Sequence, residues 1–506
     1  MKNLLPAIAL AAFTVAPAAL SAAGTPDKPN VIVLIADDLG YGDISCYGAK
    51  TIKTPNIDAL AKNGLRFTRG YAASATSSPS RYALLTGVYP WRHKVAILPG
   101  NAPLLIPTDR PTIATMFGNA GYETAAIGKW HLGLGSGNTD WNKPIKPGPS
   151  EIGFKHSYIM AATNDRVPCV YFSNGSVVGL DPNDPIEVSY RQNFDGEPTG
   201  RSNPEMLKLK PSHGHADSIV AGVSRIGFMK GGQKARWNDA EMANVFSREA
   251  LSFISGAKKA NKPFFLYYAL HQPHVPRVPN PKFAGKSGLG PRGDVILEAD
   301  AQVGELTKFL RENGLDRNTV IVFTSDNGPV LDDGYQDQAV PLAKKKGHSP
   351  TGALRGGKYS LFEGGTRVPF IVTFPSKVRA GTVSDVPVAQ LDLYASFAKM
   401  LNKKMPEYTD SLETLDTLFG KNGAVSQRKD FVIEADGRLA YRAGDWVFIP
   451  PYRGGKYAAG NETGSLDEPT LYKIMVDVGQ RENAAAANPE KLAEMQAAFE
   501  IAKRKK

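Results

Sequence analysis

Cysteine is almost absent from this sequence. Only Cys46 and Cys169 occur among 506 residues, too few for the disulfide frameworks that hold small secreted domains together. The two thiols could pair with each other or stay free, and the sequence leaves both possibilities open. No cysteine follows the apolar N-terminal segment either, which argues against a lipoprotein anchor.

Long hydrophobic runs are missing after the N-terminus, so no later segment is predicted to span a bilayer. The one apolar run covers residues 4–20, is interrupted by Pro6 and Pro17, and leads into small residues at 21–23. That order is typical of a secretory signal peptide, which we place at 1–23. A membrane anchor is the alternative, but the prolines favour export. The mature protein is therefore predicted to be periplasmic or secreted.

Motifs for nucleic-acid binding are also lacking, although the formal net charge is +11 and the pI is about 9.3. Part of the excess lies in the basic tail at 503–506, which we interpret as a solvated end. The rest is compatible with an anionic substrate and does not by itself indicate a nucleic-acid partner. No internal repeat is evident.

Three apolar segments predict a buried parallel sheet. Residues 30–36 (NVIVLIA), 263–270 (PFFLYYAL) and 319–324 (TVIVFT) are nearly continuous apolar runs, as expected for strands covered on both faces. Helical segments lie between them. We therefore predict an α/β fold with a large, mostly parallel central sheet flanked by helices.

The predicted catalytic domain covers residues 24–410. Within it, about 136–240 is rich in glycine, proline, asparagine and aspartate, which predicts a loop-rich insertion able to shape substrate specificity. Residues 411–506 are predicted to form a smaller C-terminal α+β subdomain with an antiparallel sheet and a terminal helix.

Polar side chains follow the predicted strands at their carboxyl ends, where open α/β sheets place their sites. Asp37 and Asp38 come directly after the first strand, and two adjacent carboxylates would repel each other without a cation. Their oxygens suit a hard divalent cation, although an acidic turn is the alternative. Two further polar pairs follow other strands: Asp326 with Asn327, and Lys129 with His131, whose spacing predicts that they share one face.

The segment 74–87 (SATSSPSRYALLTG) predicts a short helix with a nucleophile at its start. Pro79 suits the first turn, and Gly87 suits the C-terminal stop. Ser77 is then placed just before the helix N-terminus, where backbone N–H groups and the helix dipole favour an anion. Arg81 lies one turn later and can point back at the same anion.

These segments together resemble the signatures of type I sulfatases, within the alkaline-phosphatase-like superfamily, and in particular bacterial glycan sulfatases. They occur in the order known for that family: Ser77-x-Pro-Ser-Arg-x-x-Leu-x-Thr-Gly, GKWHLG at 128–133, His-Val-Pro at 274–276, SDNG at 325–328, GGKYS at 356–360 and EGGTR at 363–367. The resemblance covers nearly the whole mature chain.

The resemblance implies a formylglycine-dependent sulfatase. Ser77 would be oxidised to formylglycine (3-oxoalanine) by a separate maturase, and a serine at this position implies the anaerobic radical type acting before export. The hydrated aldehyde would attack sulfur and release the alcohol, and its second hydroxyl would then expel sulfate. One Ca²⁺ ion per subunit would be bound by four oxygen-bearing residues: Asp37, Asp38, Asp326 and Asn327.

The remaining roles also follow from the resemblance. Arg81 would steady the nucleophile, and Lys129 and Lys358 would neutralise charge on the sulfate oxygens. His131 would contact the hydrated aldehyde, and His274 is the candidate acid on the leaving alcohol. In the segment after GKWHLG, Asn164 and Arg166 are the candidate substrate contacts.

Sulfated carbohydrate is the expected substrate, with a galactose-type sugar as the starting hypothesis. One alternative is a phosphate or phosphonate ester hydrolase that uses unmodified Ser77, and another is a non-catalytic protein that binds sulfated glycans. The cluster His213, His215 and Asp217 has metal-ligand residue types, but a surface loop is the preferred interpretation. Sugar identity, sulfate position, endo or exo action and oligomeric state stay open.

Overall fold

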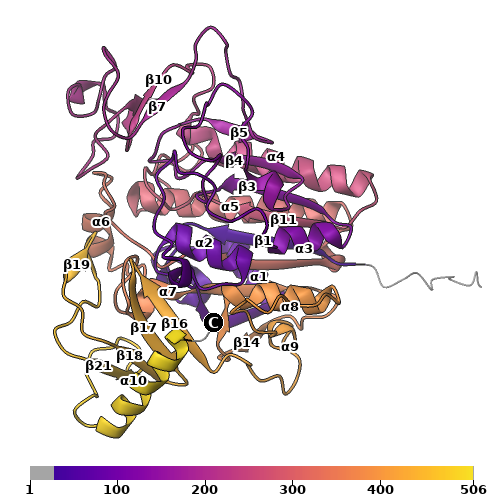
Figure 1. Ribbon diagram of the computed structural model, residues 1–506, viewed down its shortest axis with the longest axis vertical. Helices are drawn as coiled ribbons and strands as arrows, with labels where there is room; N and C mark the ends of the chain where they lie inside the picture. Colours follow the sequence, from indigo (N-terminus) through magenta and orange to yellow (C-terminus); the bar gives the residue numbers. More distant parts are fainter. Residues whose placement is uncertain (1–27, 505–506) are drawn as a thin grey trace, which may run out of the picture.

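A computed structural model describes residues 28–504 of the chain (Figure 1). The proposed signal peptide at 1–23 and the last two residues of the basic tail lie outside the described residues. Among the helices in the described range, none has the length and apolar character needed to cross a membrane. Cys46 and Cys169 are both free, which settles the choice between pairing and free thiols.

An 11-stranded sheet organises the larger part of the molecule. Its parallel centre runs in the order β12 (Thr319–Ser325), β1 (Asn30–Ala36), β11 (Phe264–Ala269), β3 (Glu123–Lys129) and β4 (His156–Met160). Every residue of β1, β11 and β12 is buried, as their apolar runs predict. The expected α/β fold with a mostly parallel sheet is confirmed.

The two edges of the sheet depart from parallel order. Beyond β12 lie β13 (Arg367–Thr373), antiparallel to its neighbours, then β2 (Leu65–Tyr71), with β14 (Thr382–Ser384) and β15 (Val388–Ala389) both pairing with β2. At the other edge, β5 (Tyr171–Ser173) and β6 (Ser176–Val177) continue antiparallel from β4. Three strands of this sheet therefore fall within the segment 136–240, which otherwise consists mainly of turns and short pieces.

Helices cover both faces of the sheet (Figure 1). One layer contains α1 (Pro55–Lys62), α4 (Met242–Lys259) and α5 (Gly290–Glu312), with α5 packed against the other two. The opposite layer contains α2 (Ser77–Thr86), α3 (Ile113–Asn119) and α8 (Leu393–Met400), which pack against one another. Two further helices, α6 (Ala339–Lys346) and the single-turn α7 (Glu363–Thr366), lie in the loops that follow β12.

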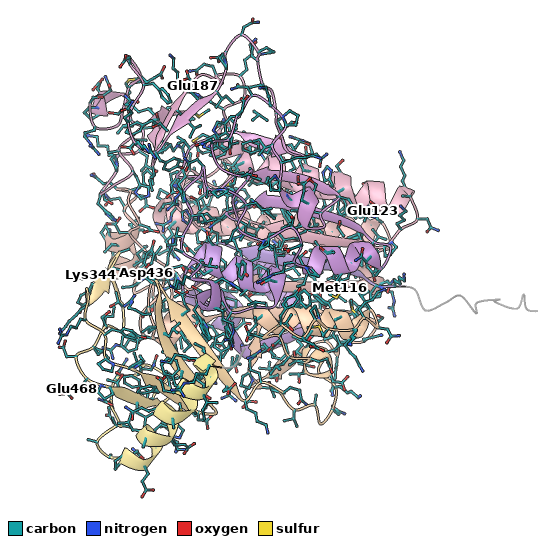
Figure 2. The ribbon with its side chains drawn as sticks, in the orientation of Figure 1. Met116, Glu123, Glu187, Lys344, Asp436 and Glu468 are labelled. Carbon is teal, nitrogen blue, oxygen red and sulfur yellow. The ribbon has the colours of Figure 1, made fainter. Side chains whose placement is uncertain are left out.

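Small two-stranded sheets project from segment 136–240 beyond the edge of the central sheet. There, β7 (Glu187–Ser189) pairs with β10 (Phe228–Lys230), and β8 (Ile219–Val220) pairs with β9 (Val223–Ser224). In Figure 2, Glu123 at the start of β3 and Lys344 on α6 lie at opposite sides of the view. The carboxyl ends of the parallel strands face the side of α6.

The C-terminal part forms a four-stranded antiparallel sheet: β16 (Asp430–Ala435), β17 (Arg438–Ala443), β18 (Trp446–Ile449) and β21 (Thr470–Lys473). Helix α10 (Pro489–Arg504) packs on β17 and β18, the hairpin β19 (Tyr457–Ala458) and β20 (Asn461–Glu462) extends outward, and α9 (Leu415–Leu418) precedes the sheet. Ser74 forms a β-bridge with Glu434 of β16, and Ala75 N–H donates to the Glu434 carbonyl at 2.8 Å. The small sheet thus holds the segment that leads into α2.

Candidate active site

Helix α2 places Ser77 at the floor of a pocket. Thr76 is extended (φ −145°), and Ser77 is the first helical residue, one position further into the helix than the sequence predicted. The Ser80 hydroxyl donates to the Ser74 carbonyl at 2.8 Å and accepts from Ser74 N–H at 3.1 Å, which closes the turn before the helix. Gly87 ends the helix with φ +69°, and all ten helical residues are buried.

The Ser77 hydroxyl faces charged groups from three strand ends. Its Oγ accepts from Lys129 Nζ at 2.9 Å, while Asp37 Oδ1 and Asn327 Oδ1 each lie 3.4 Å from it. The residue is only 3% exposed. The structure therefore brings the predicted nucleophile, one predicted lysine and two predicted metal ligands into direct contact.

Asp37, Asp38, Asp326 and Asn327 meet because β1 and β12 are adjacent and parallel. Asp38 N–H donates to Asp326 Oδ1 at 3.2 Å, and Asn327 Nδ2 donates to Asp38 Oδ1 at 2.7 Å. The second oxygen of Asp37, Oδ2, is buried and has no hydrogen-bond partner among the described residues. The four predicted metal ligands therefore form one cluster with a free carboxylate oxygen.

Three buried cations balance these carboxylates. Arg81 Nη2 lies 2.8 Å from Asp326 Oδ2, Lys129 Nζ lies 2.6 Å from Asp37 Oδ1, and Lys358 Nζ lies 3.0 Å from Asp38 Oδ2. Burial raises the pKa of Asp37 well above its usual value, and repulsion from Asp326 and Asp38 adds to this despite Lys129. Burial lowers the pKa of Lys129. Both shifts arise mainly from burial, which disfavours the charged form of each side chain.

The cluster fits a hard divalent cation. Ligand atoms of Asp37, Asp38 and His274 all lie within 4.8 Å of one another, as atoms that share an ion do. Asp37 Oδ1 is paired with Lys129, but Oδ2 of the same carboxylate is buried without a partner among the described residues. Carboxylate and amide oxygens are the ligands that Ca²⁺ prefers. His274 is the one histidine in this group of ligand atoms among the described residues.

Both predicted histidines reach the pocket as neutral imidazoles. Burial, with nearby lysines, holds the pKa of His131 and of His274 well below the usual value. His131 Nε2 contacts the Leu98 carbonyl at 2.9 Å, and its Nδ1 has no partner among the described residues. His131 has φ +55° and lies beyond the end of β3, so a shared strand face with Lys129 does not describe it.

His274 is oriented by the chain that follows it. Its Nδ1 lies 2.6 Å from the Val275 carbonyl, which can only accept, so Nδ1 carries the proton in the neutral ring. Its Nε2 lies 3.8 Å from Asp38 Oδ2 and is then an unprotonated lone pair. His274 can pass a proton from Nε2 only after it has first taken one up.

The cavity above Ser77 is small, about 60 Å³, and polar. Ser77, His131, His274 and Lys358 line its inner end, as predicted from the sequence. Its outer wall is formed mainly by residues from loops: Ile97, Asp165, Arg166, His215, Ile226, Asp333 and Tyr359. Arg166 is thus in the cavity wall. The other candidate substrate contact, Asn164, is absent from the lining and donates from Nδ2 to the Pro276 carbonyl at 3.1 Å.

The surface-loop interpretation is wrong for His215. Its Nε2 lies 2.9 Å from Asp165 Oδ2, and its side chain is 10% exposed, whereas that of His213 is 57% exposed. Burial alone would lower the pKa of His215, but Asp165 raises it above its usual value. The β-bridge between Pro211 and Tyr335 pulls this loop over the pocket, a long-range contact that local sequence does not reveal.

Asp165 joins His215 to a second cation. Arg166 Nη1 lies 3.0 Å from Asp165 Oδ1, and the Thr163 hydroxyl also donates to that oxygen. Burial works against a charged Asp165, but Arg166 and His215 hold its pKa well below the usual value. The outer wall therefore presents an ionised carboxylate flanked by a guanidinium and an imidazole.

Asp333 is another wall residue that the sequence did not predict. Its Oδ2 lies 2.7 Å from Lys358 Nζ, and its Oδ1 lies 3.3 Å from the Tyr359 hydroxyl. Burial disfavours charge on Lys358, but Asp333 and Asp38 raise its pKa well above the usual value. The acidic pair Asp332–Asp333 shortly after the SDNG segment is the sequence signal that could have indicated this role.

Comparisons with known proteins agree with this geometry. The Sulfatase family pattern matches residues 29–403. An N-acetylgalactosamine-6-O-sulfatase of Bacteroides thetaiotaomicron is 48% identical over 484 residues, which are 94% of this chain and 93% of that protein. Human arylsulfatase A is 29% identical over 489 residues, covering 92% of this chain and 85% of that protein.

Solved structures extend the comparison to three dimensions. A structure described under the metabolism of multiple glycosaminoglycans by B. thetaiotaomicron superposes with a TM-score of 0.91 at 48% identity, covering 94% of this chain and 100% of that one. A sulfatase from Pseudoalteromonas sp. gives a TM-score of 0.70 at 25% identity, over 94% of this chain and 89% of the other. With three quarters of its length matched by the family pattern, the chain belongs to the sulfatase family, the enzymes that hydrolyse sulfate esters.

Proposed function

We propose that this sulfatase removes the 6-sulfate of N-acetylgalactosamine in sulfated glycans. The main support is the identity of 48%, spread over 94% of the chain, to a bacterial N-acetylgalactosamine-6-O-sulfatase. The pocket supports it as well, because the Lys358 cation and two histidines line its inner end and polar groups line its outer wall. A sulfate ester would enter first, with the sugar ring against the outer wall.

Residue 77 is the proposed nucleophile, as formylglycine made from Ser77. Once hydrated, this group supplies two hydroxyls, one to attack sulfur and one to expel sulfate, which spares the enzyme a second attack on sulfur. Lys129 holds the oxygen at position 77, with its Nζ 2.9 Å away. Arg81 fixes the carboxylate of Asp326 beneath this oxygen. His131 contacts the hydrated aldehyde through the lone pair of its Nδ1, which has no partner among the described residues.

A single Ca²⁺ ion is the proposed metal, held by Asp37, Asp38, Asp326 and Asn327. When bound, it supplies positive charge that favours an ionised oxygen at position 77. The free Oδ2 of Asp37 supports this assignment, because an ion would satisfy an otherwise unpartnered buried oxygen. His274, which lies within the same group of atoms, is proposed to face the substrate instead.

Lys129, Lys358, His131 and His274 are proposed to surround the sulfate group. Two lysines neutralise charge on its oxygens as the bond to the leaving alcohol breaks. The negative ester beside His274 favours a protonated imidazole, which then carries a proton on Nε2 toward that alcohol. His274 is therefore charged in the complex and neutral without substrate, because the chain alone holds its pKa low.

The sugar contacts are proposed to come from the outer wall. Asp165 accepts hydrogen bonds from sugar hydroxyls, while Arg166 and His215 donate them and hold Asp165 in place. Asp333 holds the Lys358 ammonium at the inner end of the pocket until a sulfate takes the place of the Asp333 carboxylate. Asn164 contributes by fixing this segment to the chain after His274, through its bond to the Pro276 carbonyl.

Maturation and location complete the proposal. Residues 1–23 direct export to the periplasm or beyond, residues 24–410 form the catalytic domain with its insertion at about 136–240, and residues 411–506 form the supporting subdomain. An anaerobic-type maturase is the proposed transient partner that oxidises Ser77. Because Ser77 is 3% exposed in the folded chain, this partner must act on the unfolded one.

Mass spectrometry of the peptide containing residue 77, from protein made in its native host, tests the central claim. Oxidation of the alcohol to the aldehyde removes two hydrogens, so a loss of ~2 Da is expected. The same protein should release sulfate from 6-sulfated N-acetylgalactosamine. Fully active protein with an intact serine would contradict the mechanism, and faster turnover of phosphate or phosphonate esters would favour the alternative esterase.

A further inference from the structure

A second pocket lies where the C-terminal sheet meets the central sheet, lined from β2 and β15 on one side and from β16 and β17 on the other. Its volume is about 400 Å³. It shares no lining residue with the catalytic pocket. Two acidic residues, Asp430 and Asp445, and four cationic ones line it: Arg69, Arg428, Lys429 and Arg442.

Arg442 in this pocket is buried without a hydrogen bond. Its side chain is 5% exposed, and Nε and Nη2 have no partner among the residues that the structure describes. The nearest carboxylate oxygen, Glu363 Oε1, lies 4.0 Å from Nε, beyond hydrogen-bonding distance. The guanidinium otherwise stacks on Tyr71, 4.4 Å from the ring centre. A buried cation in this state is costly and calls for a partner.

Two of the acids near Arg442 are engaged elsewhere. Asp445 pairs with Arg69 at 3.2 Å, and Asp430 Oδ2 accepts from the Tyr441 hydroxyl at 2.9 Å. Glu363 Oε2 accepts from the Tyr71 hydroxyl at 2.8 Å and from Arg367, whereas its buried Oε1, 4.0 Å from Arg442 Nε, has no hydrogen-bond partner among the described residues.

The other cations of the pocket differ from Arg442. Arg428 is held by Asp392, with its Nε 2.6 Å from Asp392 Oδ2. Lys429 is exposed at the rim. Arg442 is thus the one lining arginine without a hydrogen-bonded partner in the described chain.

We propose that this pocket is an oxyanion site, in which Arg442 binds a sulfate or carboxylate group with Lys429 and Arg69 at the rim. A planar guanidinium matches the paired oxygens of such groups. The volume lies in the range of sites for small ligands, so the oxyanion can be free inorganic sulfate or the acidic group of a sugar residue. The site is independent of the proposed substrate and of residue 77.

Sulfate binding to the full-length chain tests the proposal. The Lys358→Ala variant, which weakens the catalytic sulfate contacts, is titrated with inorganic sulfate against chloride at matched ionic strength, by calorimetry and by thermal shift. We expect one remaining sulfate site. Adding Arg442→Met should weaken it at least about tenfold, the loss expected for a hydrogen-bonded charged contact. Adding Arg453→Met, an exposed arginine that lines neither pocket, should leave it unchanged.

Diffraction from crystals soaked in selenate gives a second readout that needs no variant, in case Arg442→Met does not fold. Anomalous density beside Arg442 supports the site. Selenate in the catalytic pocket alone, or only water beside Arg442, overturns it, as does equal sulfate affinity with and without Arg442.

The source of the oxyanion is then separated by competition. A sulfated disaccharide that displaces selenate at a concentration at least about tenfold below that of inorganic sulfate indicates a glycan site, and equal potency indicates free sulfate. Either result supports the oxyanion site, and displacement by neither ligand contradicts it. If this site fails, the mass of the peptide containing residue 77 and the hydrolysis of sulfate esters are unaffected, so the two proposals fail separately.

Discussion

The floor and the wall of the catalytic pocket are built differently. The floor consists of residues at the ends of β1, β3 and β12 and in the first turns of α2, and its charged side chains (Asp37, Arg81, Lys129 and Asp326) are fully buried and paired with one another. The wall comes from loops far apart in the sequence and is more open, with His215 10% and Arg166 17% exposed. The sheet therefore fixes the positions of the reactive groups in the floor. The loops of the wall can vary without disturbing the sheet, and they set which substrates the pocket binds.

Loss of the proposed nucleophile in the floor should have the largest effect. Ser77→Ala leaves nothing to oxidise and no oxygen to attack sulfur, so kcat should fall by about 10⁵-fold or more, as for other lost nucleophiles. Ser78→Ala is the matched control, because its hydroxyl is buried next door and accepts only from Leu98 N–H at 3.3 Å. Sulfate release from a sugar sulfate measures both variants. An active Ser77→Ala protein would contradict the assignment of residue 77 as the nucleophile.

Removal of the proposed Ca²⁺ ion from the floor is expected to have the next largest effect. Chelation should abolish measurable activity and lower the free energy of unfolding by about 3 kcal/mol relative to protein at a Ca²⁺ concentration 100 times the Kd. The reason is that Asp37 Oδ2 has no partner among the described residues, so removal of the proposed ion leaves this buried oxygen unsatisfied. Thermal unfolding with and without added Ca²⁺ measures this. An unchanged midpoint together with full activity would exclude a metal at the floor.

Damage to the wall should change selectivity and spare the chemistry. His215→Ala removes a hydrogen-bonded group beside Asp165, so kcat/KM on a sugar sulfate should fall about 10- to 100-fold. Turnover of an activated aryl sulfate, which lacks the sugar hydroxyls, should stay nearly unchanged. His213→Ala is the control, because that histidine is on the same loop but 57% exposed. Equal losses on both substrates would mean that His215 supports the chemistry of the floor and not the selectivity of the wall.

The smallest effect is expected on stability alone, from the strand that supports the floor. Burial raises the pKa of Glu434 from 4.5 to about 7. The folded protein therefore holds this proton more tightly than the unfolded chain, and stability falls as pH rises from 4.5 through 7. Glu434→Gln should remove this fall, a gain of at most about 3 kcal/mol at pH 8 and none at pH 4. Unfolding at both pH values, with activity at pH 7, checks it.

Sequence reasoning reached the floor because its residues follow local patterns. An apolar strand with polar residues at its end identifies Asp37 and Asp326 without knowledge of the rest, and the segment around Ser77 identifies its own helix. Family resemblance then connected these pieces with Lys358 and His274. The central sheet was predictable for the same reason, since fully buried strands have continuous apolar runs.

The wall was missed because no local pattern encodes it. His215 reaches the pocket through a bridge between Pro211 and Tyr335, residues 124 positions apart, in a segment with few regular elements. Asp333 belongs to the wall because it pairs with Lys358, and helix α6 separates these two residues in the sequence. Strands β4 to β6 were also not foreseen, because they are short and lie among turns within 136–240. Such contacts depend on packing between distant segments and not on periodicity.

The complete burial of α2 has a consequence for any preparation of this protein. If oxidation needs an open chain, a molecule that folds before meeting the maturase keeps its serine permanently. The population then consists of fully competent and wholly inert molecules that share one fold and one charge. Measured kcat is diluted by the inert share while KM stays constant. Specific activity therefore depends on the rate of Ser77 oxidation relative to the rate of folding inside the cell. Catalysis itself reports only what fraction of the molecules was oxidised before folding.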